Sequence, residues 1–219
     1  MGLIVALDSL SAELSAAMVE SLCDIVDGFK VGLPLVLSHG VGHVSLIHGI
    51  CPRRLWVLDF KLADIGHVMV ESVKPLLPFV DAVIAHSFVG YRGALGVLKE
   101  FLDREGKRLV LVAAMSHPGS VEVYDKVLGS IVGVVERVEP WGLVAPATRT
   151  RIIRLLRERL GEELVILAPG VGFQGAEPGE ALCAGANYEI VGRLITRSQQ
   201  PPAAARDVIR LQRERLRQC

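Results

Sequence analysis

The sequence predicts an α/β fold in which eight β/α units close into a (β/α)8 barrel of the TIM-barrel type. Short apolar runs of strand length alternate eight times with longer segments of helical period. The apolar runs are nearly continuous in Val, Ile, Leu and Ala, which is typical of parallel strands covered on both faces. The chain is short for a barrel of this kind, so an open doubly wound sheet is kept as the alternative.

The strands are predicted from runs rich in apolar and β-branched residues. In chain order they are 3–8 (LIVALD), 28–32 (GFKVG), 55–61 (LWVLDFK), 81–87 (DAVIAHS), 108–116 (RLVLVAAMS), 141–147 (WGLVAPA), 164–170 (LVILAPG) and 188–193 (YEIVGR). Helical segments separate them, so consecutive strands are expected to be parallel neighbours.

The helical segments are predicted at 11–25, 33–48, 65–77, 92–104, 118–136, 149–160, 176–184 and 201–217. Pro118 and the pair Pro201-Pro202 stand where first-turn prolines belong, Thr148 can cap the segment that follows it, and Gly161 comes just past that segment's end. Between those two signals, five apolar residues share one face opposite arginines, as expected of a helix packed on a sheet: Ile152, Ile153, Leu155, Leu156 and Leu160.

Composition predicts one domain over 1–219 whose partner is a small molecule. The chain has 219 residues, 51% of them hydrophobic, which is enough for one large core. Lys+Arg and Asp+Glu number 24 each, so no long-range field favours nucleic acid or an anionic membrane. We find neither a basic leader nor an apolar stretch of about 18 residues, and therefore expect a cytoplasmic protein. The four cysteines form no C-x-x-C pair or metal-ligand spacing, so we expect reduced thiols.

Polar side chains gather at the predicted carboxyl ends of the strands, where barrel enzymes carry their catalytic groups. Asp8 ends the first strand, Lys30 lies in the second, and the third ends in the tripeptide DFK (59–61). The fifth strand runs into Ser116-His117, and the last two run into glycine-rich turns. One such residue would be explained as a solvated strand end, but the whole set indicates an active site.

The segment LDFKLADIGH (58–67) carries the closest grouping of charge. Alternation along a strand puts Asp59 and Lys61 on one face, about 6.6 Å apart along the chain. Because Lys30 comes from the neighbouring strand, we expect Asp59 to lie between two lysines. Opposite charges about 4 Å apart attract by roughly 4 kcal/mol at an effective dielectric of about 20, which keeps all three groups ionised near neutral pH. A structural ion pair that closes the barrel is the alternative interpretation.

The turn APGVGFQG (168–175) matches G-x-G-x-x-G literally. A dinucleotide-binding fingerprint would open a βαβ unit and would be followed by an acid at a strand end, whereas the nearest acid here, Glu189, lies inside a strand. Loops after the seventh and eighth strands of a barrel commonly hold phosphate through backbone N–H groups, and Gly192-Arg193 would add a planar cation there. We predict a phosphorylated substrate. Tight connecting turns would also explain the glycines.

These motifs together resemble the orotidine 5′-phosphate decarboxylase family. LDFKLADIGH is similar to that family's D-x-K-x-x-D signature, and VALDS, FKVGLPLVL, AMSHPGS, LAPGVGFQG and IVGR appear in the family's order. The resemblance implies a barrel that converts orotidine 5′-monophosphate to uridine 5′-monophosphate and CO2, the last step of de novo pyrimidine biosynthesis, with no metal or organic cofactor. It also implies a homodimer with active sites at the subunit interface.

The resemblance implies a role for each matching residue. Lys61 would be the proton donor to the pyrimidine carbon, Asp59 would lie against the substrate carboxylate, and Asp64 would enter the partner subunit's site. Asp8 and Lys30 would contact the ribose, with Lys30 also part of the catalytic charge network. The remaining implied substrate contacts are Ser116 at the pyrimidine, Gln174, Gly192 and Arg193 at the phosphate, and Ile65, Pro169, Gly170, Val171 and Gly172.

Two positions depart from the family pattern. Gly66-His67-Val68 stands where the family often has a proline followed two positions on by threonine, so a hydroxyl contact to the neighbour's substrate is missing. Phe173 stands in the seventh-strand turn where a smaller residue is common, so the lid beside the phosphate is expected to pack differently. Neither departure touches the charged residues of the signature.

Sugar-phosphate enzymes with the same segment are the competing interpretation, for example 3-keto-L-gulonate 6-phosphate decarboxylase and hexulose 6-phosphate synthase. Their pattern holds an enediolate with Mg²⁺ and has a glutamate where this chain has Lys30, whose charge would repel the metal. A barrel that only binds a nucleotide would use Gly192-Arg193 but would not need the Lys30, Asp59 and Lys61 series. Lys30 therefore favours the pyrimidine reaction.

Overall fold

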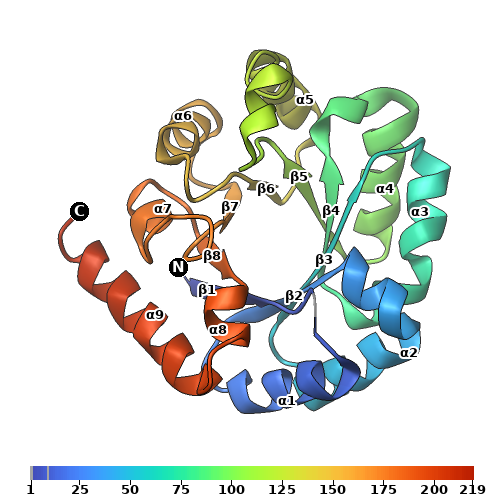
Figure 1. Ribbon diagram of the computed structural model, residues 1–219. Helices are drawn as coiled ribbons and strands as arrows, with labels where there is room; N and C mark the ends of the chain where they lie inside the picture. The colour runs from blue at the N-terminus through green and yellow to red at the C-terminus, as the bar shows by residue number, and fades with distance from the viewer. Residues whose placement is uncertain (1, 9) are drawn as a thin grey trace.

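A computed structural model of the chain describes residues 2–8 and 10–219 and shows the predicted closed barrel (Figure 1). Each strand pairs in parallel with the next, and β8 pairs with β1 to close the barrel. The strands are β1 (Gly2–Ala6), β2 (Gly28–Gly32), β3 (Leu55–Leu62), β4 (Ala82–His86), β5 (Arg108–Val112), β6 (Gly142–Val144), β7 (Val165–Pro169) and β8 (Tyr188–Val191). The doubly wound alternative is therefore excluded.

The α-helices surround the barrel, except that the short α8 lies within the ring formed by the others in the view of Figure 1. They are α1 (Ala12–Leu22), α2 (Leu33–Ile50), α3 (Gly66–Val73), α4 (Gly96–Arg104), α5 (Leu128–Val138), α6 (Thr150–Leu160), α7 (Glu180–Cys183), α8 (Arg193–Thr196) and α9 (Pro201–Leu216). In α6, Ile153 and Leu156 are fully buried, which confirms the predicted apolar face, although Leu155 at its margin is exposed.

The strands are buried along almost their whole length. All five residues of β2 are buried, and Phe29 on this strand packs against Trp56 on β3 with ring centroids 5.1 Å apart. Because both faces of a parallel sheet are covered, the strand sequences show no alternation of apolar and polar residues. Polar side chains on the strands are consequently found mainly toward the carboxyl ends, and the candidate site forms there.

Two predicted helices are divided into shorter pieces. The segment predicted at 118–136 is a 3-10 turn over Pro118–Glu122, followed by irregular chain before α5 begins at Leu128. The segment predicted at 65–77 changes from α3 to a 3-10 turn over Lys74–Phe79, which contains two prolines. Proline lacks the N–H that a continuing helix needs, and the two prolines of Lys74–Phe79 therefore account for the end of α3. Pro118 stands in the first turn, where proline is tolerated, and does not account for the irregular chain after Glu122.

The boundary signals of α6 and α9 gave mixed results. Gly161 ends α6 with φ 80, and its N–H donates to the Arg157 carbonyl, as predicted. Pro201 is the first residue of α9, also as predicted. The capping role predicted for Thr148 was wrong, because Arg149 occupies the cap position of α6 and makes no side-chain cap bond.

Helix α2 is more apolar than we expected from the sequence. Its 18 residues have a mean hydropathy of 1.3. By length and composition alone, the helix is therefore long and apolar enough to cross a membrane. The prediction that no apolar stretch reaches this length was therefore wrong. In the barrel wall, α2 packs against α1 and β2 through a face that includes the buried Leu35, Val44 and Ile47. Gly40, with φ 76 and ψ 175, kinks it within its span.

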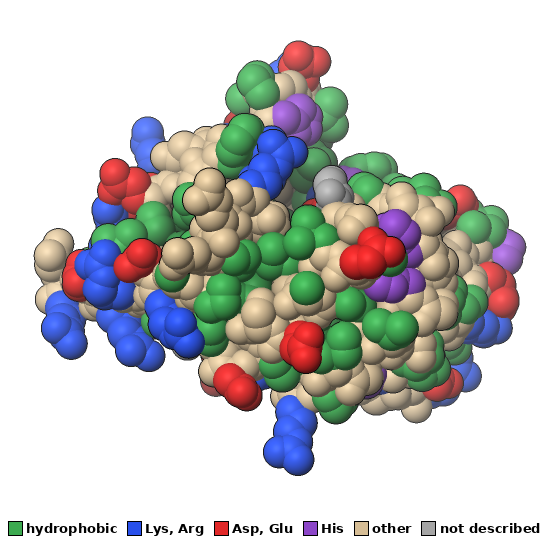
Figure 2. All heavy atoms as spheres, turned by 60° about the horizontal axis from the view of Figure 1, so that its bottom comes forward, with side chains coloured by type: hydrophobic (Ala, Val, Ile, Leu, Met, Phe, Trp, Pro, Cys, Tyr) green, Lys and Arg blue, Asp and Glu red, His purple; other side chains and the backbone are tan. Residues whose placement is uncertain are grey.

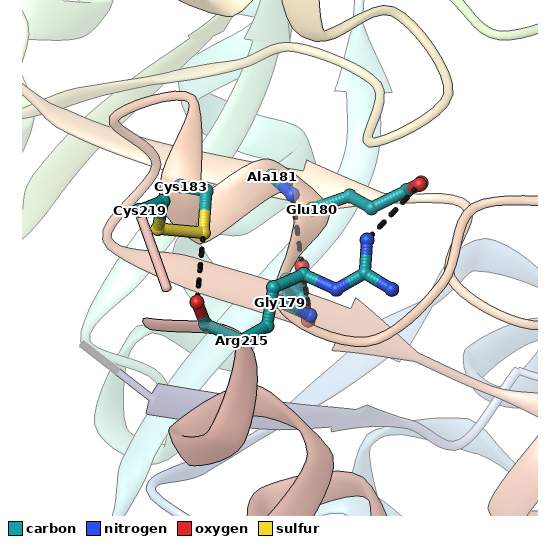
Figure 3. Close-up of a disulfide and its surroundings, with 7 residues drawn as sticks. Gly179, Glu180, Ala181, Cys183, Arg215 and Cys219 are labelled. Atoms are coloured by element: carbon teal, nitrogen blue, oxygen red, sulfur yellow. Dashed lines mark hydrogen bonds and ion pairs between the residues drawn. A yellow bond between two sulfur atoms is a disulfide. The ribbon is translucent and has the colours of Figure 1, made fainter. Parts of the chain in front are cut away.

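The four cysteines form two disulfides, so the prediction of reduced thiols was wrong. Cys23–Cys51 joins the ends of α1 and α2, and Cys183–Cys219 joins α7 to the end of the chain. Figure 3 shows the second bridge beside Arg215, whose guanidinium reaches the Glu180 carboxylate at 3.3 Å. The paired residues are 28 and 36 positions apart in sequence, so only the tertiary fold brings them together.

Charge is spread over the surface, as the equal counts of acidic and basic residues suggest. Figure 2 shows acidic, basic and apolar side chains interspersed over one face, with Lys and Arg side chains gathered toward one edge. Some of the exposed charges pair along a helix, for example Arg210 with Glu214 at 2.9 Å. Exposed pairs of this kind contribute at most about 1 kcal/mol each, so the buried core is the main source of stability.

Candidate active site

A cavity of about 660 Å³ opens at the carboxyl ends of the strands. The predicted site residues that line it are Asp8, Lys30, Asp59, Lys61, Ser116, Pro169, Gly170, Val171, Gln174, Gly192 and Arg193. Much of the remaining wall is apolar and includes Leu10, Leu14, Met115, Val144, Pro146 and Ile190. The structure thus brings one charged end and one glycine-rich end of the predicted site to the same cavity.

A row of alternating charges forms the floor of this cavity. The Nζ of Lys30 lies 2.7 Å from Asp8 Oδ1 and 3.0 Å from Asp59 Oδ2, and the Nζ of Lys61 lies 2.7 Å from Asp59 Oδ1. The side chains of Lys30 and Asp59 are only 7% and 8% exposed. The prediction that Asp59 lies between two lysines is therefore confirmed, and the network extends to Asp8.

Pairing within this row overcomes the effect of burial on ionisation. Burial by itself would raise the pKa of the Asp59 carboxyl, but the ammonium groups of Lys30 and Lys61 outweigh it and hold that pKa below its usual value. Burial would likewise lower the pKa of Lys30, but the carboxylates of Asp59 and Asp8 raise it above its usual value. Asp59 and Lys30 are consequently ionised near neutral pH.

The backbone of Lys61 has an unusual conformation. Its φ of 46 lies in the left-handed region, which costs a non-glycine residue on the order of 1–3 kcal/mol. The pairing of β3 with β4 shifts register between Leu58 and Leu62, and such irregularities redirect side chains beside active sites. Simple alternation predicted the correct face for Lys61, but this local shift also shapes its approach to Asp59.

Asp64 and Ile65 follow the end of β3 and are not among the residues that line the cavity of this single chain. Asp64 is exposed, its carboxylate accepts a hydrogen bond from the Ile65 N–H at 2.7 Å, and Ile65 is 53% exposed. The departure at Gly66 has a local explanation, because a Cβ there would lie 2.4 Å from the Cβ of Val97 on α4. The tight packing of α3 on α4 therefore requires glycine at this position.

The loop between β7 and α7 depends on its glycines. Gly170, Gly172 and Gly175 have φ values of 113, 79 and 101, in the region that favours glycine. The Gly172 N–H donates to the Ala176 carbonyl at 2.8 Å, and the Gly175 N–H donates to the Gly172 carbonyl at 2.9 Å. The resulting compact turn presents Gln174 to the cavity, while Gly172 itself is not among the lining residues.

Glu189 explains why the G-x-G-x-x-G match is not a dinucleotide site. Its fully buried carboxylate accepts hydrogen bonds from the N–H groups of Gly179 (2.9 Å) and Ala181 (3.1 Å) and from Gln212 Nε2 (3.0 Å). Burial raises its pKa despite these bonds. Glu189 therefore anchors the end of the β7–α7 loop to α9 and is not available to a ribose.

Sequence reasoning missed the ion pair that holds the segment after β5. This strand ends at Val112, earlier than predicted, and the chain continues through Ser116 at the cavity edge. The guanidinium of Arg149, just before α6, pairs with Asp125 and donates to Ser120 Oγ at 3.2 Å. The segment that carries Ser116 is thereby tied to the adjacent β6–α6 connection. No role was predicted for Arg149, although it directly follows the predicted cap residue Thr148.

A second missed pair lies at the end of β4. His86 Nδ1 is hydrogen-bonded to the hydroxyl of Tyr124. Burial lowers the pKa of His86 and the nearby Lys61 charge lowers it further, while burial raises the pKa of Tyr124 to about 12. Both groups are thus neutral near neutral pH. The sequence signal is the histidine near the end of the run DAVIAHS, a polar residue at the carboxyl end of a strand.

The cavity is not arranged as a metal centre. In residues 2–8 and 10–219, no group of three His, Cys, Asp or Glu side chains is placed to hold a metal ion. The two carboxylates of the charged row, Asp8 and Asp59, both contact the ammonium of Lys30. A divalent cation at these carboxylates would have to displace that ammonium.

Comparison with known proteins identifies the family. The model of the Orotidine 5′-phosphate decarboxylase / HUMPS family matches residues 1–208. The chain is 49% identical to the orotidine 5′-phosphate decarboxylase of Aeropyrum pernix, over 87% of this chain and 79% of that protein. It is 38% identical to that of Saccharolobus solfataricus, over 96% of this chain and 93% of that protein.

Solved structures agree with this similarity. The crystal structure of orotidine 5′-monophosphate decarboxylase from Sulfolobus solfataricus matches with a TM-score of 0.89 at 37% identity, covering 98% of each chain. That of the enzyme from Methanocaldococcus jannaschii complexed with inhibitor BMP matches with a TM-score of 0.88 at 33% identity, covering 96% of this chain and 98% of that one. Sequence, fold and site geometry agree, and the chain belongs to the orotidine 5′-phosphate decarboxylase / HUMPS family.

Proposed function

We propose that this chain, acting as one catalytic domain over 1–219, decarboxylates orotidine 5′-monophosphate to uridine 5′-monophosphate and CO2. The observation that carries the proposal is the Lys30–Asp59–Lys61 row at one end of a cavity whose other end holds Gln174 and Arg193. This arrangement offers charges for a reacting carboxylate and a separate place for a phosphate. The reaction completes UMP biosynthesis and requires no metal or organic cofactor.

Lys61 acts as the proton donor. Loss of CO2 leaves negative charge on a pyrimidine carbon, so an ammonium held at that carbon stabilises the charge as it develops and then supplies a proton. The Lys61 side chain is 35% exposed and reaches the cavity, whereas Lys30 is almost fully enclosed between two carboxylates. Lys61 is therefore the lysine better placed to protonate the reacting carbon.

Asp59 faces the substrate carboxylate. Two carboxylates in one buried site repel each other, and the departure of CO2 relieves the repulsion. Lys30 and Lys61 keep Asp59 ionised, so its charge is present when substrate binds. Lys30 and Asp8, at the far side of the row, hydrogen-bond the ribose hydroxyls.

The other end of the cavity binds the nucleotide phosphate. Arg193 supplies a planar cation, Gln174 supplies a side-chain amide, and Gly170, Val171 and Gly192 supply backbone N–H donors. Pro169 and Gly172 have no free N–H and shape the turn that carries these donors. Ser116 hydrogen-bonds the pyrimidine from the neighbouring rim. Binding energy at the phosphate fixes the ring over the charged row and favours closure of the β7–α7 loop, which excludes water.

The working unit is a homodimer in which Asp64 and Ile65 enter the partner subunit's site. Both residues follow β3 directly, three and four positions after Lys61. Asp64 is exposed and Ile65 is 53% exposed, so they are accessible to a second copy of the chain. Backbone groups of Gly66-His67-Val68 take the place of the missing hydroxyl contact.

We place the enzyme in the cytoplasm, where its nucleotide substrate is made and used. The two disulfides are compatible with that location as structural crosslinks, because some intracellular proteins, notably those of hyperthermophiles, carry them. Their stabilising effect does not depend on secretion.

A Mg²⁺-dependent sugar-phosphate reaction is the alternative within this family, and the position of Lys30 disfavours it. The test is to treat purified protein with chelator and follow the ultraviolet absorbance of orotidine 5′-monophosphate together with release of CO2. The proposal predicts undiminished conversion to uridine 5′-monophosphate. Activity that disappears on chelation and returns with Mg²⁺ would contradict the cofactor-free reaction. Absence of conversion with or without metal would contradict the proposal that orotidine 5′-monophosphate is the substrate.

A further inference from the structure

The ring of Phe173 lies against the guanidinium of Arg193 at the phosphate end of the cavity. The Cζ of Arg193 is 3.4 Å from the centre of the ring, and both side chains line the cavity. Phe173 is 64% exposed, so burial from water gives its side chain little reason to occupy this place. The attraction between the Arg193 cation and the face of the aromatic ring accounts for the position of this side chain.

The stack leaves the hydrogen-bonding edge of Arg193 available. Within the described residues, no carboxylate lies within the 4.0 Å salt-bridge distance of Arg193, whereas Arg149 and Arg215 each pair with a carboxylate. A carboxylate would occupy the N–H donors and neutralise the charge. An aromatic ring contacts only the flat face, so the fork of donors and the full positive charge stay free for an anion.

The backbone on both sides of this contact is held in place. A Cβ added to Gly172 would lie 2.9 Å from Leu194 Cδ2, so the residues preceding Phe173 and following Arg193 are themselves in close contact. The 172–175 turn is closed by the hydrogen bonds described above. The loop after β7 is thus pressed against the start of α8 at two successive positions, and the ring has a defined place over the guanidinium.

We infer that Phe173 is a positioning residue that holds Arg193 with its donors directed at the phosphate of the substrate. The inference rests on the proposed phosphate role of Arg193 and adds a residue that acts through it. Phe173 lies at the opposite end of the cavity from the Lys61 and Asp59 charges, so its effect is on phosphate-dependent binding and not on the chemical step. It gives a function to the departure from the smaller residue common at this position.

The test is a double-mutant cycle on KM and kcat. Phe173→Leu keeps apolar volume but removes the aromatic face, and should raise KM for orotidine 5′-monophosphate roughly threefold to fivefold with kcat unchanged. Phe173→Tyr, which keeps the face, should retain the wild-type KM. With Arg193→Ala already present, Phe173→Leu should have no further effect. For orotidine, which lacks the phosphate, Phe173→Leu should leave kcat/KM unchanged.

Three results would overturn the inference: an equal effect of Phe173→Leu with and without Arg193, failure of Phe173→Tyr to preserve KM, or an equal loss with orotidine. The same cycle is measured with inorganic phosphate as the probe, using its dissociation constant, which needs no turnover. Wild-type protein that converts substrate but shows no dependence on Phe173 contradicts this inference alone. Wild-type protein that converts no substrate contradicts the proposed function, and the phosphate cycle then decides the inference separately.

Discussion

The Nζ of Lys61 lies 2.7 Å from both carboxylate oxygens of Asp59. This bidentate contact fixes the ammonium in the cavity although the Lys61 backbone is in the left-handed region. Asp59 in turn contacts Lys30 at 3.0 Å, so its carboxylate is paired with both lysines. The arrangement requires Asp59 to stay ionised, which makes the charged row sensitive to acid.

The stability of the protein should therefore fall in acid in a way that depends on Asp59. The pKa of this carboxyl is lower in the folded protein than in the unfolded chain, so its contribution is complete above the unfolded value of about 4 and is lost as pH falls through the lower folded value. Asp59→Asn should lose less stability than wild type from about pH 4 downward. Thermal unfolding followed by circular dichroism between neutral and acid pH measures this. Parallel pH profiles for the two proteins would show that Asp59 contributes no such dependence.

The Cys183–Cys219 bridge should stabilise the fold by restricting the unfolded chain. Closing a loop of 36 residues is worth about 3–4 kcal/mol in the chain-entropy account, or roughly 10 °C in the unfolding midpoint of a protein this size. Replacement of both cysteines by alanine should lower the midpoint by that amount under oxidising conditions. The matched control is the Cys23 and Cys51 double replacement, which should behave similarly because its loop is comparable.

Reduction distinguishes the crosslink from side-chain packing. Fully reduced wild-type protein should unfold at a lower temperature than either double variant that keeps one bridge. A wild-type midpoint that is the same before and after verified reduction would contradict a stabilising role for these disulfides.

The proposed entry of Asp64 into the partner subunit's site predicts complementation between inactive subunits. Lys61→Ala and Asp64→Ala homodimers should each be inactive. A hybrid has one site that combines an intact Lys61 with an intact Asp64 from the partner, so random exchange should restore about a quarter of wild-type activity. Activity is measured before and after subunit exchange, with hybrid formation verified by mass. Hybrids without activity would place Asp64 in its own subunit's site or outside catalysis.

The barrel and its charged row could be predicted from the sequence because both depend on local patterns. Continuous apolar runs mark buried parallel strands, and strand alternation together with strand order was enough to place Asp59 between Lys30 and Lys61. Parallel strands end at the same rim, so the residues at their ends meet without any knowledge of side-chain packing.

Features that depend on contacts between distant segments could not be predicted in this way. The disulfides join helix ends that only the closed barrel brings together. The left-handed Lys61 lies within a register shift against β4, and the requirement for Gly66 follows from the proximity of Val97. The Arg149–Asp125 pair likewise connects segments that follow different strands. None of these has a signature in the spacing of nearby residues.

The most direct test of the account is turnover by Lys61→Ala. Removal of the ammonium should reduce kcat at least about a thousandfold, because the developing carbanion loses both its stabilising charge and its proton donor. The dissociation constant for uridine 5′-monophosphate should change little, since the phosphate end is intact. Lys99→Ala, on α4 and outside the cavity lining, should match wild type in both measurements. Turnover by Lys61→Ala within tenfold of wild type would contradict the assignment of Lys61 as the proton donor.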